Sequence, residues 1–106
     1  MATIDPKVVE DLRAKFGADV AVLDADGESV VVKRPSRQTY GRFREYIMSD
    51  NISRKASANE VLCVDCIVYP TGLEREAIFD RKPGLVDAFA GELVKMAGGG
   101  AEAKKS

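Results

Sequence analysis

The sequence predicts an α+β fold that is mostly helical: an N-terminal helix, one β-hairpin and then a bundle of about four short helices. Two observations predict this fold. Two short β-branched runs flank an Asp-Gly pair at 26–27, which is a strong signal for a hairpin turn. Elsewhere, apolar residues recur at the spacing of one helix face, and capping residues stand before several of these stretches.

The first helix is marked at both of its ends. Asp5 can cap the first amides, and Pro6 suits the first helical position. Ile4 and Val9 have the spacing of a hydrophobic staple across that cap. Gly17 can end the helix in a left-handed conformation. We therefore expect the helix to end at or just before this glycine.

The hairpin comprises residues 20–23 and 29–32, and a second helix follows it over 37–48. Because an isolated hairpin is marginal in water, it should lie against the helices or pair its edge with another chain. Pro35 ends the second strand, since it cannot donate to a ladder, and Ser36 can cap the helix. The apolar stripe of this helix consists of Tyr40, Phe43 and Ile47.

Three more helices are predicted. One runs from about 53 to 68, and its second half is apolar nearly all round, as in a buried helix. A buried strand is the alternative for that β-branched half. Thr71 and Glu74 form a capping box for a short fourth helix, and Pro83 opens a fifth. The stripe of the fifth helix is Leu85, Val86, Phe89, Ala90, Leu93, Val94 and Ala97.

The length of 106 residues fits one domain, which we expect to span 1–97. The Gly-rich polar end, 98–106, should be a disordered tail. No apolar run approaches the length that spans a bilayer, and the first residues do not form a signal peptide. We therefore expect no membrane association and a cytoplasmic location, in the host cell if a phage encodes the chain.

Composition argues against an enzyme. The chain has no histidine, which removes the commonest general base and the commonest zinc ligand. Cys63 and Cys66 form a C-x-x-C, but no second cysteine pair accompanies it, so we expect buried structural thiols, no metal and no cofactor. Asp65 lies among these apolar residues and should face a gap or pair with an arginine.

The segment from Lys33 to Lys55 carries a net charge of +5 on a chain whose formal charge is −1. Its basic helix face would consist of Arg37, Arg42 and Arg44. A solvated surface is one interpretation and an acidic protein partner is another. The alternative is a small nucleic-acid-associated regulator, because Tyr40, Phe43 and Tyr46 interleave with the cations as in proteins that stack bases. The balanced charge of the whole chain makes nucleic-acid binding the less favoured interpretation.

Three stretches resemble small bacteriophage tail assembly chaperones. One is a strand ending in Arg34-Pro35-Ser36, followed by a helix with Tyr40 and Phe43 three apart. The second is the apolar run 61–70, which closes on Tyr-Pro, and the third is 81–85, which opens a Leu-rich helix. The resemblance implies a non-enzymatic protein that coats the helical tape-measure protein during tail assembly, with self-association in some members.

The residues favour the same class of function. Several short helices with broad apolar stripes can leave a groove between them, and an amphipathic client helix fits such a groove. We expect the client to be a tape-measure protein or another apolar helical protein, with a homo-oligomer possible. The aromatic residues expected to contact it are Tyr40, Phe43, Phe79 and Phe89.

Overall fold

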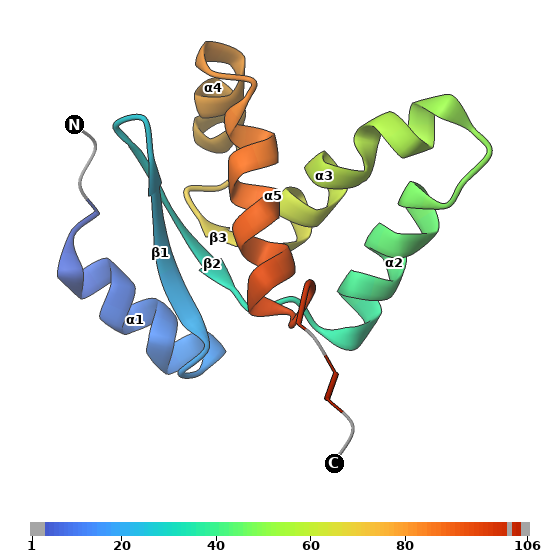
Figure 1. The fold of residues 1–106 in the computed structure, drawn as a ribbon. Helices are drawn as coiled ribbons and strands as arrows, with labels where there is room; N and C mark the ends of the chain where they lie inside the picture. Colours follow the sequence, from blue (N-terminus) through green and yellow to red (C-terminus); the bar gives the residue numbers. More distant parts are fainter. Residues whose placement is uncertain (1–3, 102, 105–106) are drawn as a thin grey trace.

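The computed structural model describes residues 4–101 and 103–104, and Figure 1 shows how its helices surround a small sheet. The elements in chain order are α1 (Pro6–Phe16), β1 (Val20–Ala25), β2 (Glu28–Lys33), α2 (Arg37–Ile47), α3 (Ile52–Cys66), β3 (Ile67–Tyr69), α4 (Gly72–Arg81) and α5 (Leu85–Met96). This arrangement confirms the predicted α+β class, with one helix before the hairpin and four after it.

Local sequence accounts for the first elements. The Asp5 carboxylate accepts a hydrogen bond from the amide of Lys7 (2.9 Å), and the Ser36 hydroxyl accepts one from the amide of Thr39 (3.1 Å). Gly17 follows α1 with a φ of +95°, a conformation that disfavours any side chain. Both predicted caps and the predicted end of α1 are therefore confirmed.

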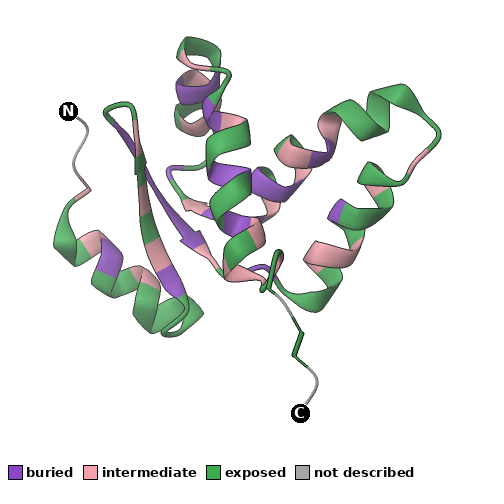
Figure 2. Cartoon of the chain, in the orientation of Figure 1, coloured by how far each residue is buried: buried purple, intermediate pink, exposed green. Residues whose placement is uncertain are grey.

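The sheet lies between two apolar layers, because alternate side chains of β2 point to opposite faces. On one face, Val20 and Val31 pack with Val9 of α1. On the other face, Val30 and Val32 pack with a larger cluster from the later helices. Figure 2 shows the resulting pattern: buried residues lie where the helices meet the sheet, and the turn between α2 and α3 is mostly exposed.

The prediction for the C-terminal end of the third helix is wrong, because this end is a strand. α3 ends at Cys66, and Ile67–Tyr69 form β3, antiparallel to β2 in a sheet of order β1-β2-β3. Two effects favour extended backbone here: Ile67 and Val68 are β-branched, and Pro70 disfavours the helical conformation of Tyr69. Pairing with β2 then satisfies the backbone groups of these residues. The strand alternative therefore applies only to Ile67 and Val68, the last two residues of the predicted helix.

The starts of α4 and α5 also differ from expectation. Thr71 precedes α4, but its side chain makes no capping hydrogen bond, so the expected capping box does not form there. α5 begins at Leu85 rather than at Pro83. The amide of Leu85 bonds to the carbonyl of Lys82 (3.0 Å), so Pro83 lies in the turn that leads into the helix.

Two glycines of the predicted tail belong to the end of α5. The amide of Gly98 bonds to the carbonyl of Lys95 (3.0 Å) and that of Gly99 to the carbonyl of Val94 (2.8 Å). With a φ of +85° at Gly98, this is a Schellman motif. Residues 102 and 105–106 lie outside the described residues, and disorder of the remaining tail stays a prediction.

Candidate functional site

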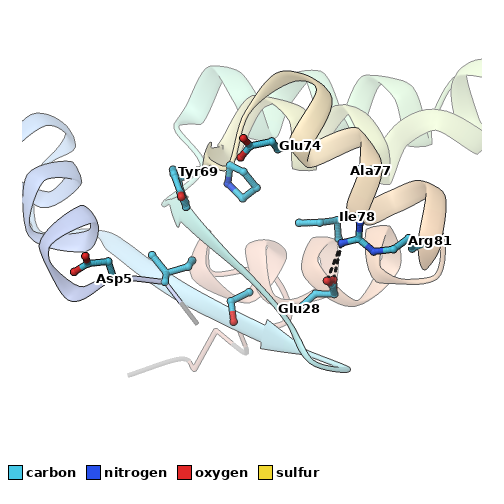
Figure 3. Close-up of a pocket in the computed structure, with 10 residues that line it drawn as sticks. Asp5, Glu28, Tyr69, Glu74, Ala77, Ile78 and Arg81 are labelled. Carbon is cyan, nitrogen blue, oxygen red and sulfur yellow. Dashed lines mark hydrogen bonds and ion pairs between the residues drawn. The ribbon is translucent and has the colours of Figure 1, made fainter. Parts of the chain in front are cut away.

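A cleft of about 480 Å³ opens between the start of α1, the sheet and α4 (Figure 3). Its apolar wall combines Ile4 with Tyr69 and Pro70 from the end of β3, and with Ala77 and Ile78 from α4. The polar groups on its lining are Asp5, Glu28, Ser29, Glu74 and Arg81. Segments far apart in the sequence therefore meet at this cleft only because the chain folds.

Glu28 and Arg81 form an ion pair on one side of the cleft (Figure 3). The guanidinium Nη2 lies 2.9 and 3.1 Å from the two carboxylate oxygens, and the Glu28 side chain is only 10% exposed. Asp5 and Glu74 add two more carboxylates to the lining. Because Arg81 is already paired, the cleft is better suited to an apolar or cationic group than to an anion.

The cysteine pair lies inside the fold. Cys63 and Cys66 are both fully buried, and the Cys63 thiol lies 3.3 Å from the carbonyl of Val86. Burial, with a smaller contribution from the neighbouring Cys66, raises the pKa of Cys63 to about 12. Burial likewise raises the pKa of Cys66 to about 11. Thiols held in the protonated form are poor nucleophiles and poor metal ligands, which supports the predicted packing role.

The part of the chain that the structure describes contains no cluster of side chains suited to binding a metal ion. No group of three or more Cys, Asp or Glu side chains there is arranged to hold an ion. Asp65, the lone carboxylate of the apolar segment, instead pairs with Arg42 at 3.2 Å. Of the two expectations for Asp65, a gap or an arginine partner, the ion pair with Arg42 is the one found.

The three arginines of the predicted basic face are all exposed on α2. Arg37 and Arg44 line a shallow hollow of about 450 Å³ with Tyr40 and Ala97. Arg42 is engaged by Asp65, so it contributes less free positive charge than the sequence suggested. The face offers two unneutralised guanidinium groups beside the hollow, since neither Arg37 nor Arg44 is in any ion pair among residues 4–101 and 103–104.

Three of the four aromatic residues expected to contact a client are core residues. Phe43, Phe79 and Phe89 are buried, and the rings of Phe79 and Phe89 pack with their centroids 6.5 Å apart. Tyr40 is half-buried and packs on Phe43 at 5.7 Å. In this conformation the three phenylalanines present almost no surface to a partner. Their helical spacing marked the core stripe rather than a binding surface.

Exposed apolar side chains at the turn between α2 and α3 were missed from the sequence. Ile47, Met48 and Ile52 are 40%, 75% and 83% exposed. Ile47 was expected on the buried stripe of α2, which is wrong because the end of this helix projects beyond the core (Figure 1). The available signal was the position of these residues on either side of the polar turn 49–51.

Comparisons with known proteins establish a family and a fold. A family model described as a domain of unknown function (DUF6848) matches residues 12–105. No curated protein sequence matches the chain. A solved structure of the uncharacterised protein rbstp2171 from Bacillus stearothermophilus is similar, with a TM-score of 0.69 at 23% identity. The match covers 92% of this chain and 96% of that one, which supports the fold alone. No helix among the described residues is long and apolar enough to cross a membrane.

Proposed function

We propose that this chain, which belongs to the DUF6848 family, is a non-enzymatic assembly chaperone that holds an apolar helical client. The client class that the sequence resemblance implies is a phage tape-measure protein, which is long and helical. The surface for this client is the exposed apolar tip of the α2–α3 hairpin, made of Ile47, Met48 and Ile52. We refer to these three residues as the hairpin tip.

The hairpin tip carries the proposal because its exposure is unusual for residues of this size. Scattered single apolar residues are normal on a protein surface, but here three lie within six positions of the chain. Met48 adds a flexible side chain of the kind that adapts to varied partner surfaces. A client helix would gain binding free energy by covering these side chains, at roughly 25 cal/mol for each Å² of apolar area.

Cations flank the hairpin tip on both helices. Arg44, which also lines the hollow beside Tyr40, is exposed near the end of α2, and Arg54 lies above the ring of Tyr46 at 5.7 Å near the start of α3. Glu45 and Asp50 are exposed on the same segment, so the surroundings of the tip carry both signs of charge, and the two guanidinium groups would pair with carboxylates beside the apolar stripe of a client helix. Because the cations lie at the rim, we expect them to change the rate and the salt dependence of binding more than its strength.

The geometry supports the nucleic-acid alternative less well. A protein that binds single strands stacks bases on exposed aromatic rings. On the basic segment, Phe43 is buried, and Tyr40 and Tyr46 are half-buried against the core. Arg34 and Arg42 are neutralised by Asp19 and Asp65, at 3.3 and 3.2 Å. Few groups therefore remain for stacking or for phosphate.

Co-expression tests the proposal. A long helical phage tape-measure protein is produced alone, with the wild-type chain, or with a triple variant Ile47→Ser, Met48→Ser and Ile52→Ser. We expect the wild-type chain to keep the client soluble and the triple variant to fail. The matched control is Leu73→Ser, which removes an equally exposed apolar residue (88%) from α4. This control should protect the client as well as wild type does.

Two results would overturn the proposal. One is equal protection by the wild-type chain and the triple variant, which would show that the hairpin tip is not the client surface. The other is tight binding of a single-stranded oligonucleotide with no effect on the client, which would favour the nucleic-acid alternative. Thermal unfolding of each variant verifies that the fold is retained.

A further inference from the structure

The outer edge of β1 has unpaired backbone groups. β1 pairs with β2 from Val20↔Lys33 to Ala25↔Glu28, closed by a two-residue turn at Asp26 and Gly27. Both turn residues have positive φ, which identifies the tight hairpin turn in which Ala25 and Glu28 bond to each other. Alternation then directs the amides and carbonyls of Val20, Val22 and Asp24 away from β2. Among the described residues, no backbone bond reaches these outward groups.

The two edges of the sheet differ in how they are protected. β3 has only three residues, pairs irregularly with β2 and is followed by Pro70, all of which discourage pairing with another strand. β1 has six residues in regular register and contains no lysine, proline or bulge. α1 and α5 lie beside its two faces (Figure 1), and among the described residues no backbone hydrogen bond joins either helix to its edge. Apart from Asp24 near the turn, this edge carries none of the features that discourage pairing, and an edge of this length is a template for strand pairing.

Two apolar side chains lie beside the open edge. Val20 packs on the α1 face of the sheet, and Val22 therefore points to that same face, where it is 39% exposed. Phe16, at the end of α1, is 38% exposed. Its ring lies 5.6 Å from the amine of Lys33, which is the cross-strand partner of Val20. Apolar surface and unpaired backbone therefore occur together at this edge.

We propose that β1 pairs antiparallel with β1 of a second copy of this chain, around a two-fold axis at Val22. In this register Val22 lies opposite Val22, and Val20 lies opposite Asp24 of the second copy, so the outward groups of all three residues bond to each other. The sheet continues from one copy into the other, and Val22 loses its exposed surface. The outward N–H and C=O groups of β1 are then hydrogen-bonded instead of being left unpaired at a sheet edge.

Charge favours a second copy in this orientation. Lys15 and Lys33 flank the Phe16 ring at the Val20 end of β1, at 5.3 and 5.6 Å from its centroid. Asp24 lies at the other end, where it accepts a hydrogen bond from Ser29. Antiparallel pairing brings the anionic end of one strand to the cationic end of the other, and parallel pairing would place like charges together.

Sedimentation of the purified chain tests this pairing. Over a concentration series up to about 200 µM, which detects a dimer with a Kd of about 100 µM or tighter, we expect the average mass to rise with concentration toward twice that of the monomer. Val22→Lys should give a monomer at every concentration, because it places a cation on each strand at the axis. The matched control is Val64→Lys, since Val64 is equally exposed (38%) but lies on α3. This control should remain dimeric.

A disulfide tests the register. In Val22→Cys the two new thiols would face each other across a hydrogen-bonded pair, about 5.5 Å apart at Cα, which a disulfide can bridge. With oxidised glutathione this variant should form a covalent dimer, and Val64→Cys should not. A monomeric wild-type chain, or a dimer that survives Val22→Lys, would overturn the proposal. The inference does not rest on the proposed function, because none of these measurements uses a client.

Discussion

The base and the tip of the α2–α3 hairpin contrast sharply although the same two helices form both. At the base, Phe43, Leu62 and Cys66 are buried against β2 and α5. At the tip, Met48 and Ile52 are mostly exposed, although they are as apolar as the residues at the base. Amphipathic spacing therefore identifies a side that can be buried. It does not identify how far along the helix another element reaches.

The difference assigns separate roles to the two ends. Residues at the base hold the fold together, because each loses most of its contact with water when the chain folds. Residues at the tip gain little on folding and stay available to a partner. We therefore expect substitutions at the base to change the free energy of unfolding and substitutions at the tip to change binding.

The largest effect is expected from truncating the base. Leu62→Ala should lower the free energy of unfolding by about 2–5 kcal/mol, because it leaves a cavity in a fully buried site. Ile52→Ala, which removes a similar volume from the tip, should change it by about 0.5 kcal/mol or less. Urea unfolding of both variants measures the contrast. Equal losses would show that Ile52 is packed as tightly as Leu62.

A smaller effect is expected from the thiols at the base. Cys63→Ala and Cys66→Ala should each cost about 1 kcal/mol through lost packing. The thiols should also make stability depend on pH. Their folded-state pKa values of about 12 and 11 exceed the ordinary value of 9.0, so the unfolded chain releases their protons first.

The sign of that dependence is fixed by the raised pKa values. The contribution of the two thiols is fully present below pH 9 and is lost as the pH rises through about 11 for Cys66 and about 12 for Cys63, by about 1 kcal/mol per thiol at pH 10. Urea unfolding of wild type and of the double alanine variant between pH 7 and pH 10.5 isolates this contribution. An identical pH dependence in the two proteins would show that the thiols are not buried in solution.

The smallest effect is expected at the Arg42–Asp65 ion pair, between the base and the tip. The Arg42 side chain is more than half exposed, so Asp65→Asn should lower the free energy of unfolding by about 1 kcal/mol or less. The loss should shrink in 1 M NaCl, because salt screens exposed pairs. Melting curves at low and high salt measure it. A loss of several kcal/mol would show that this ion pair stabilises the fold as strongly as the buried residues at the base do.

The candidate site was harder to predict than the fold. The caps at Asp5 and Ser36 and the turn at Asp26 act between neighbours in the chain, so their residues were sufficient to find them. The cleft joins Ile4, Glu28 and Arg81 across the whole chain, and no spacing links these positions in sequence. The aromatic residues were chosen by size and spacing, and those properties also describe a core.

Local sequence was enough to place the elements whose start or end depends on nearby hydrogen bonds and backbone conformation: α1, the β1–β2 hairpin and α2. Contacts between distant segments were needed to find that Ile67–Tyr69 pair with β2, that Ile47 is exposed, and that Glu28 meets Arg81. The two groups differ in the range over which the interactions act along the chain. A cap or a turn is decided within about four residues, but the burial of an apolar side chain depends on which distant element packs against it.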